Sequence, residues 1–109
     1  MSEVIIAGGD PDGIGEALET QGATVRYAEG TADRDALEAA GVLDADTLVV
    51  TDAGLATSVT VALDCNPELR IVIYTRESVP EFVKGQAGHI VDPALLDPET
   101  VAEELLRDE

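Results

Sequence analysis

Apolar and polar residues alternate along the chain in short blocks, and five of the apolar blocks have the length and composition of β-strands. They are rich in β-branched residues and are bounded by Gly, Asp or Pro. The blocks are Val4–Ala7, Ala23–Tyr27, Thr47–Val50, Ile71–Tyr74 and His89–Val91. Three of them are almost continuously apolar, as a parallel strand covered on both faces requires. The second is more mixed, and we expect it at an edge of the sheet.

Each apolar block is followed by a segment in which hydrophobic residues recur at helical spacing. The expected helices are residues 14–20, 33–40, 53–65, 79–84 and 99–106. Asp33 is placed to cap the second helix, and Gly41 is placed to end it. Asp97 and Pro98 mark the start of the last helix. The middle helix is rich in small residues, which is typical of a helix that packs closely on a sheet.

Five strand–helix units in succession predict an α/β fold of the Rossmann or flavodoxin-like type. In this fold a doubly wound parallel sheet is the middle of three layers, and its crossovers are right-handed. A length of 109 residues corresponds to one domain, so we expect a single Rossmann-like domain over residues 1–109. Ligands of such sheets bind at the carboxyl ends of the strands, and candidate functional residues are therefore sought there.

The composition adds a large excess of acid to this picture. The chain has 23 Asp and Glu residues against 6 Lys and Arg, which gives a formal net charge of -17. Self-repulsion destabilises such a domain unless salt screens it, and the Debye length falls to about 3 Å at 1 M salt. With one lysine and an aromatic content of 3%, the composition predicts an extreme halophile's protein that K+ or another salt stabilises. A mesophilic acidic protein is the alternative.

Charge and cysteine content also restrict the partners and the compartment. No basic cluster is present, which argues against nucleic acid or an anionic membrane as a partner. The apolar runs are too short to span a membrane and the N-terminus lacks a positive region, so we expect a cytoplasmic protein. Cys65 is the only cysteine, and we expect a buried small hydrophobe. His89, the only histidine, is expected to be a packed or capped residue.

The turn after the first strand is the strongest candidate for a ligand site. Gly9, Gly13 and Gly15 lie between a strand and a helix, in a spacing that resembles the short-chain dehydrogenase variant of the dinucleotide fingerprint. Glycines in this place permit a tight turn and a close approach to pyrophosphate. Glu29 ends the second strand, 20 residues after Gly9, where an acid would accept a hydrogen bond from a ribose hydroxyl. These residues predict binding of NAD or another nucleotide.

Two acids in the same turn favour a purely structural role. Asp10 and Asp12 lie where phosphates would go, and two like charges 4 Å apart repel by about 1 kcal/mol even in water. Asp12 is also placed to cap the first helix, which would occupy the anion site itself. Ile14 and Gly15 stand where a P-loop requires Lys and Ser or Thr, so a P-loop is excluded.

A second set of polar residues follows the later strands. Thr51 and Asp52 end the third strand, Thr75 ends the fourth and Asp92 follows the fifth. This layout resembles the phospho-acceptor site of response-regulator receiver domains, which share the five-unit fold. A receiver carries a lysine where this chain has Asp92, and the acid pair that holds Mg²⁺ is reduced here to Asp10. The interpretation that follows is a degenerate receiver-like domain.

Three further stretches carry a second resemblance. Residues 36–46 match an "L-x-x-A-G-hydrophobic-x-x-A-D" lead into a strand, Thr51–Asp52 matches a Thr-Asp loop, and residues 86–93 match a "G-A-x-x-V-hydrophobic-x-P" ending. The order resembles the N-terminal Rossmann domain of Trk/RCK-type potassium-transport regulators. Those domains have six strands in the order 3-2-1-4-5-6, and loss of the third leaves 2-1-3-4-5. The resemblance implies NAD or ATP binding, carried by Gly9, Gly13, Gly15, Glu29, Thr51 and Asp52.

These observations leave several functions open. The main interpretation is a small regulatory module of nucleotide-binding type without a catalytic site, which acts through a partner protein or as a homodimer. The alternatives are a ligand-free structural or interaction domain and a degenerate receiver-like domain. A short-chain dehydrogenase lacks support because neither tyrosine is followed by lysine four residues later. The chain also resembles short haloarchaeal proteins labelled "CTP synthetase", but the two sites of that activity do not fit in 109 residues without a P-loop.

Overall fold

A five-stranded parallel sheet organises the computed structural model, which describes residues 2–10 and 12–107. Its strands lie in the order β2-β1-β3-β4-β5, and each neighbouring pair is parallel. The predicted flavodoxin-like fold and strand order are therefore confirmed, and so is the edge position of the second strand. The strands are β1 (Glu3–Ala7), β2 (Thr24–Ala28), β3 (Thr47–Val50), β4 (Arg70–Tyr74) and β5 (His89–Val91).

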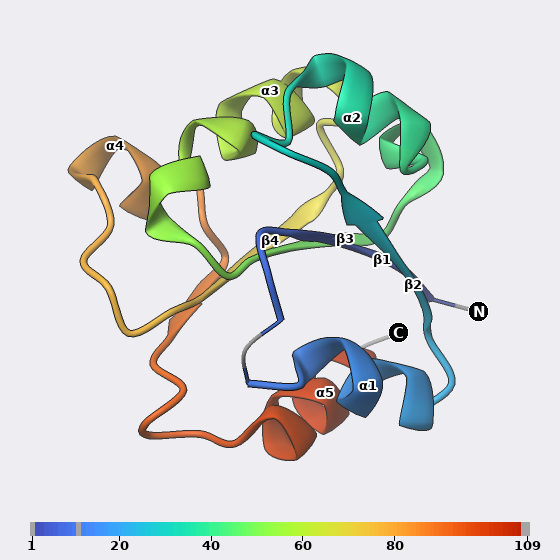
Figure 1. Ribbon diagram of the computed structural model, residues 1–109, viewed down its shortest axis with the longest axis vertical. Coiled ribbons are helices and arrows are strands. Elements are labelled where there is room, and N and C mark those ends of the chain that lie inside the picture. Colours follow the sequence, from blue (N-terminus) through green and yellow to red (C-terminus); the bar gives the residue numbers. More distant parts are fainter. Residues whose placement is uncertain (1, 11, 108–109) are drawn as a thin grey trace.

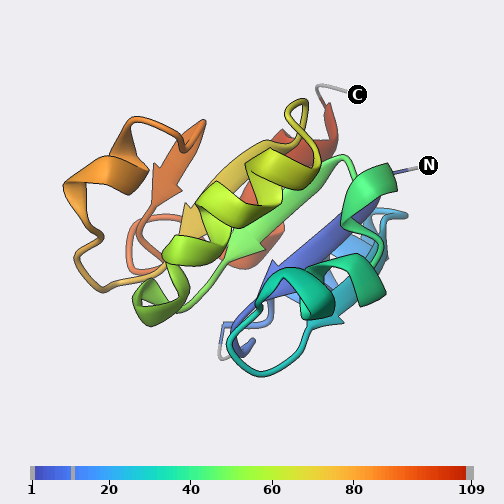
Figure 2. The same ribbon diagram turned by 90° about the horizontal axis from the view of Figure 1, so that it is seen from above.

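Helices cover both faces of this sheet, which makes the three predicted layers (Figures 1 and 2). One face is covered by α1 (Ile14–Thr20) and α5 (Pro98–Arg107), and the other by α2 (Arg34–Ala39), α3 (Thr57–Cys65) and α4 (Glu81–Lys84). Two short 3₁₀ turns, η1 (Val42–Asp44) and η2 (Ala53–Leu55), precede β3 and α3. Within the described residues no helix combines the length and the apolar character that crossing a membrane would take.

Two helices differ from the expected ones for local reasons. The segment 53–65 is divided into η2 and α3, because the Asp52 carboxylate and carbonyl hold the first turn in a tight 3₁₀ conformation through Gly54 and Leu55. The helix expected at 79–84 begins at Glu81, since Pro80 is extended and a residue before proline is kept out of the helical region.

The predicted helix ends are confirmed at three positions. The side chain of Asp33 accepts a hydrogen bond from the Ala36 N–H at 2.9 Å, and Gly41 follows α2 with a φ of 90°. The side chain of Asp97 accepts from the Thr100 N–H at 2.8 Å, and hydrogen bonding by the Thr100 side chain, followed by this N–H, lowers the pKa of the Asp97 carboxyl. These caps satisfy N–H groups that a helix leaves without partners in its first turn.

The core has two apolar layers because side chains along each strand point alternately to opposite faces of the sheet. Leu48 and Val49, neighbours on the central strand β3, are both fully buried on opposite faces. This pattern agrees with the prediction of strands covered on both sides. The layer under α2–α4 contains Ile5, Ala7, Leu48, Val50, Ile71 and Ile73, and the layer over α1 and α5 contains Val4, Ile6, Val49, Val72 and Tyr74.

Few of the acids are neutralised by contact with a base. The described residues contain four ion pairs, in each of which at least one side chain is more than half exposed: Arg34–Asp64, Arg76–Asp12, Lys84–Glu81 and Arg107–Glu104. Exposed pairs of this kind contribute about 1 kcal/mol at most. The repulsion that a net charge of -17 implies is therefore left to the solvent to screen.

We expect the unfolding temperature to rise steeply with KCl. Screening that stabilises the fold by about 2 kcal/mol would raise Tm by roughly 8–16 °C in a domain of this size. The measurement is thermal unfolding followed by circular dichroism, from about 0.1 M to about 2 M KCl, over which the Debye length falls severalfold. Sucrose, which screens no charge, is the control. A Tm that does not move with KCl, or moves equally with sucrose, contradicts the expectation.

Candidate functional site at the carboxyl edge of the sheet

Parallel pairing brings the loops that follow β1, β3 and β4 to one edge of the sheet. The strand order reverses between β1 and β3, where Ala7 pairs with Val50, and such reversal points are where ligands of this fold bind. The residues gathered here include those that the sequence analysis selected after the first, third and fourth strands. They are Gly8, Gly9, Asp10, Asp12, Gly13, Thr51, Asp52, Thr75 and Arg76.

Asp10, not Asp12, lies over the first turn of α1. Its Oδ2 atom accepts from the Gly15 N–H at 3.1 Å and from the Tyr27 hydroxyl at 3.2 Å. Its Oδ1 atom is buried without a hydrogen-bond partner. Burial, followed by the charge of Asp10, raises the pKa of the Tyr27 hydroxyl. A phosphate that approached Gly15 would have to displace this carboxylate.

The prediction that Asp12 caps α1 is wrong. Gly13 holds the cap position with a φ of 79°, and the side chain that bonds a first-turn N–H is that of Asp10. Asp12 instead forms a two-atom ion pair with Arg76, in which Oδ1 is 3.1 Å from Nη2 and Oδ2 is 3.4 Å from Nη1. Asp10 already accepts from the first-turn N–H, so Asp12 is left to pair with the guanidinium, where two charged hydrogen bonds form in parallel.

Arg76 lies at this carboxyl edge of the sheet, and the sequence analysis did not select it. It follows Thr75, which was selected because it ends the fourth strand, and the same topological argument applied to the next residue would have found it. Its pairing with Asp12 joins the β4 loop to the β1 loop. The ion pair therefore neutralises one of the two acids in the glycine turn.

Thr51 and Gly8 fasten β3 to the loop after β1. The Thr51 hydroxyl donates to the carbonyl of Gly9, and Ala7 presents a second carbonyl at 3.4 Å. Gly8 has a φ of +111°, and a Cβ atom built there would lie 2.6 Å from Thr51 Oγ1. Thr51 therefore acts on the backbone at the strand reversal, and its hydroxyl proton is already donated there.

The remaining polar side chains at this edge also bond to nearby backbone. The carboxylate of Asp52, exposed at the end of β3, accepts from the Gly54 N–H at 2.8 Å. Thr75 accepts from the Glu77 N–H at 3.2 Å, and Asp92 accepts from the Ala94 N–H at 2.8 Å. No group of His, Cys, Asp or Glu side chains within residues 2–10 and 12–107 is arranged to hold a metal ion.

The other candidates lie apart from this edge cluster or have structural partners. Glu29 lines a groove beside β2 and α2, whereas Asp12 and Gly13 line a different groove against α5. Cys65 is partly buried rather than fully buried, and its Sγ lies 3.2 Å from Arg34 Nη1. Ile14 and Gly15 are buried in the first turn of α1. Binding of NAD or another nucleotide by these residues stays a prediction.

Solved structures of similar fold include several response regulators and two proteins described as related to pilus assembly. HP1043 of H. pylori, described as an orphan response regulator, superposes with a TM-score of 0.74 at 13% identity, over 97% of this chain and 94% of that chain. A CheY-like receiver domain protein from Methanospirillum hungatei gives 0.71 at 15% identity, over 99% and 93%. A response regulator from Burkholderia pseudomallei, described with a phosphorylated aspartic acid and a calcium ion, gives 0.63 at 20% identity, over 99% and 72%.

These similarities correct the Trk/RCK interpretation. The solved structures that this chain resembles include a CheY-like receiver domain protein and other response regulators, not Rossmann domains of potassium-transport regulators, and nothing supports the CTP synthetase resemblance. The misleading motifs are structural: the stretch before β3 contains the left-handed Gly41 and η1, and Thr51 bonds to backbone. The sequence model of the family described as "Family of unknown function (DUF7126)" matches residues 4–105. No curated protein matches significantly.

Proposed function

The chain belongs to the DUF7126 family, whose description names no function, and we propose that it is a degenerate receiver-like domain that binds a partner protein without being phosphorylated. The observation that carries this proposal is the state of the acceptor position. Asp52 follows β3, where an acceptor aspartate would lie, but its carboxylate caps η2 through the Gly54 N–H. The position after β5, where a receiver has lysine, holds Asp92.

The chemistry of phosphoryl transfer explains why these two differences matter together. The transferred phosphoryl group carries negative charge that a metal ion and cationic side chains normally offset. Here Asp92 would add charge of the same sign, and Arg76 at the neighbouring loop is already paired with Asp12. The described Asp, Glu, His and Cys side chains also form no cluster of three or more that could hold a metal ion. A phosphoryl group on Asp52 would therefore be formed and held poorly.

The fixed loops at the carboxyl edge of the sheet are compatible with binding of a partner protein without phosphorylation. The edge of the sheet is tied together by Asp10, Asp12, Thr51 and Arg76, so the loops are held in one arrangement by internal bonds. A fixed scaffold of this kind presents a constant surface to another protein. The high negative charge would steer encounters with a basic partner and oppose encounters with an acidic one.

We expect the protein to remain unmodified in acetyl phosphate and Mg²⁺. The measurement is intact mass after incubation, with a receiver domain that has the full acidic pair, acceptor and lysine as the positive control. We expect less than about a tenth of the labelling of that control, since a loss of about 1.4 kcal/mol in transition-state stabilisation already slows transfer tenfold. Labelling of the wild type that Asp52→Asn abolishes would show an active receiver and overturn the proposal.

A further inference from the structure

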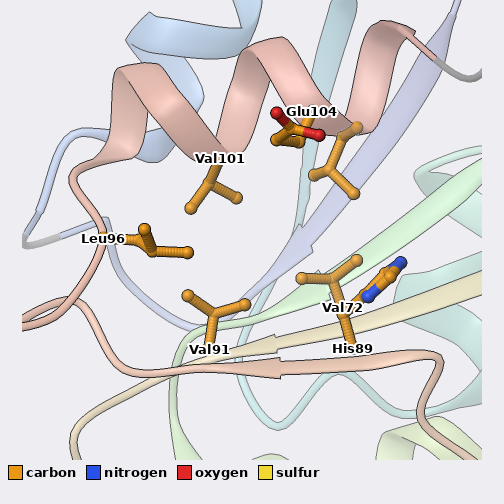
Figure 3. Close-up of a pocket in the computed structure, with 7 residues that line it drawn as sticks. Val72, His89, Val91, Leu96, Val101 and Glu104 are labelled. Atoms are coloured by element: carbon orange, nitrogen blue, oxygen red, sulfur yellow. The ribbon is translucent and has the colours of Figure 1, made fainter.

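An apolar crevice lies between α5 and the β4–β5 edge of the sheet, away from the carboxyl-edge cluster. Its volume is about 210 Å³. In Figure 3 the side chains of Val91, Leu96 and Val101 point toward a common space, with Val72 behind them and His89 and Glu104 at one side. The crevice thus has an aliphatic floor and a polar side, and it shares no residue with the candidate site.

The size of the crevice indicates what it can hold. Pockets for cofactors and drug-sized ligands are usually about 300–1,000 Å³, so a nucleotide is too large for a space of 210 Å³. A single large apolar side chain is small enough to fit into this volume. Leu95 and Leu96, on the loop between β5 and α5, are 81% and 43% exposed. Exposed aliphatic residues beside an apolar hollow are typical of protein–protein contacts.

The charges around the crevice indicate which kind of protein fits. Residues 89–107, which form β5, α5 and the loop between them, contain five Asp and Glu but only one Lys or Arg. That residue, Arg107, is already paired with Glu104 at 3.2 Å, and the nearby Arg70 donates to the carbonyl of Leu105, which lines the crevice, at 2.7 Å. An acidic partner would therefore find no free lysine or arginine here, and a second copy of this chain would bring the same acids. A basic partner would face Glu104 and the acids of α5 without that repulsion.

We propose that the crevice between α5 and β5 receives an apolar side chain of another protein, on a segment that carries Lys or Arg beside that side chain. The inference rests on the proposed partner-binding function and names the surface and chemistry of the partner. The aliphatic side chain displaces water from Val91, Leu96 and Val101, and the adjacent cations lie against Glu104 and its neighbours. Such a central anchor with a charged rim is the usual anatomy of an interface.

The test is selection from a random dodecapeptide phage library against the whole chain, at the lowest KCl concentration that keeps the chain folded, so that charge attraction is not screened out. We expect the enriched peptides to share a large aliphatic or aromatic residue flanked by Lys or Arg. Leu96→Ser should weaken their binding at least tenfold, while Leu43→Ser, the same change at an exposed leucine of η1, should not. Glu104→Gln should also weaken binding, and Glu38→Gln on α2 is its control.

Other outcomes contradict the inference in distinct ways. Enriched peptides that are acidic, or that bind Leu96→Ser as well as the wild type, would place the contact elsewhere. A dimer in sedimentation equilibrium that Leu96→Ser dissociates would assign the crevice to a second copy of the chain. Labelling of Asp52 by acetyl phosphate would overturn the phosphorylation-free function separately, whatever the peptides show, so failures of the two proposals can be told apart.

Discussion

Replacing Gly8 with alanine should lower the free energy of unfolding by about 3 kcal/mol or more, a large share of the roughly 5–15 kcal/mol that stabilises a domain. Two costs add. The φ of +111° is one that residues with a Cβ atom adopt only with strain, worth about 1–3 kcal/mol. The new Cβ would also lie 2.6 Å from Thr51 Oγ1 and 3.1 Å from the Asp52 backbone nitrogen. Chemical unfolding in high salt, followed by circular dichroism, measures the loss.

Gly22→Ala is the matched control because it separates the two costs. Gly22 has a φ of +99°, but a Cβ built there meets nothing within 4 Å. Its substitution should therefore cost only the backbone strain, about 1–2 kcal/mol. Adding Thr51→Ala to Gly8→Ala should recover part of the loss by removing the nearest atom. Equal losses at Gly8 and Gly22 would show that the close approach between the β1 and β3 loops does not stabilise the fold.

Replacing Tyr74 with alanine should destabilise the protein by about 3–5 kcal/mol, the range for truncating a buried aromatic side chain. Tyr74 is 1% exposed and ends β4 within the core layer under α1 and α5. Its hydroxyl donates to the Leu96 carbonyl at 2.9 Å, which fixes the loop beside the crevice. Tyr74→Phe keeps the ring and should cost only about 1 kcal/mol for the lost hydrogen bond. Unfolding in denaturant compares the two.

Tyr27→Ala supplies the control for this prediction. Tyr27 is 47% exposed, so Tyr27→Ala should lower the free energy of unfolding far less than Tyr74→Ala.

The pH dependence of stability gives a second test of Tyr74, because burial raises the pKa of its hydroxyl above the usual 10.0. Only the unfolded chain releases that proton just above pH 10, so stability is full below pH 10 and falls as pH rises through the folded pKa. If Tyr74→Phe lost stability above pH 10 as steeply as the wild type, this account of Tyr74 would be wrong.

The periodicity of the sequence was sufficient for the elements and the fold. Apolar runs of strand length alternate with helical spacing, and this alternation predicts a parallel sheet because each crossover needs a helix. Asp33 and Asp97 could be predicted as caps since a cap depends only on neighbours within one turn. Even the edge position of β2 followed from its mixed pattern. These are local properties, which a single stretch of chain carries by itself.

The same local patterns led to a wrong family resemblance when they were compared with Trk/RCK domains. The stretch around Gly41 and the Thr51–Asp52 pair match Trk/RCK motifs, but both serve backbone geometry that any sheet of this type requires. The glycines after the first strand likewise indicate only a sharp bend of the backbone, and they do not by themselves indicate a nucleotide site. The comparison of whole folds separated these cases, because the strand order and the number of units differ between a receiver and a six-strand domain.

The sequence by itself determined the strands and helices, the parallel α/β class, the acidity and the lack of a P-loop in this protein. The tertiary structure alone decided which acid lies on Gly15, that Asp12 pairs with Arg76 and that α5 and β5 enclose an apolar crevice. The physical reason is the range of the interactions. Caps and periodicity act within a few residues, whereas Asp12 and Arg76 are 64 residues apart and meet only because parallel strands bring their loops to one edge.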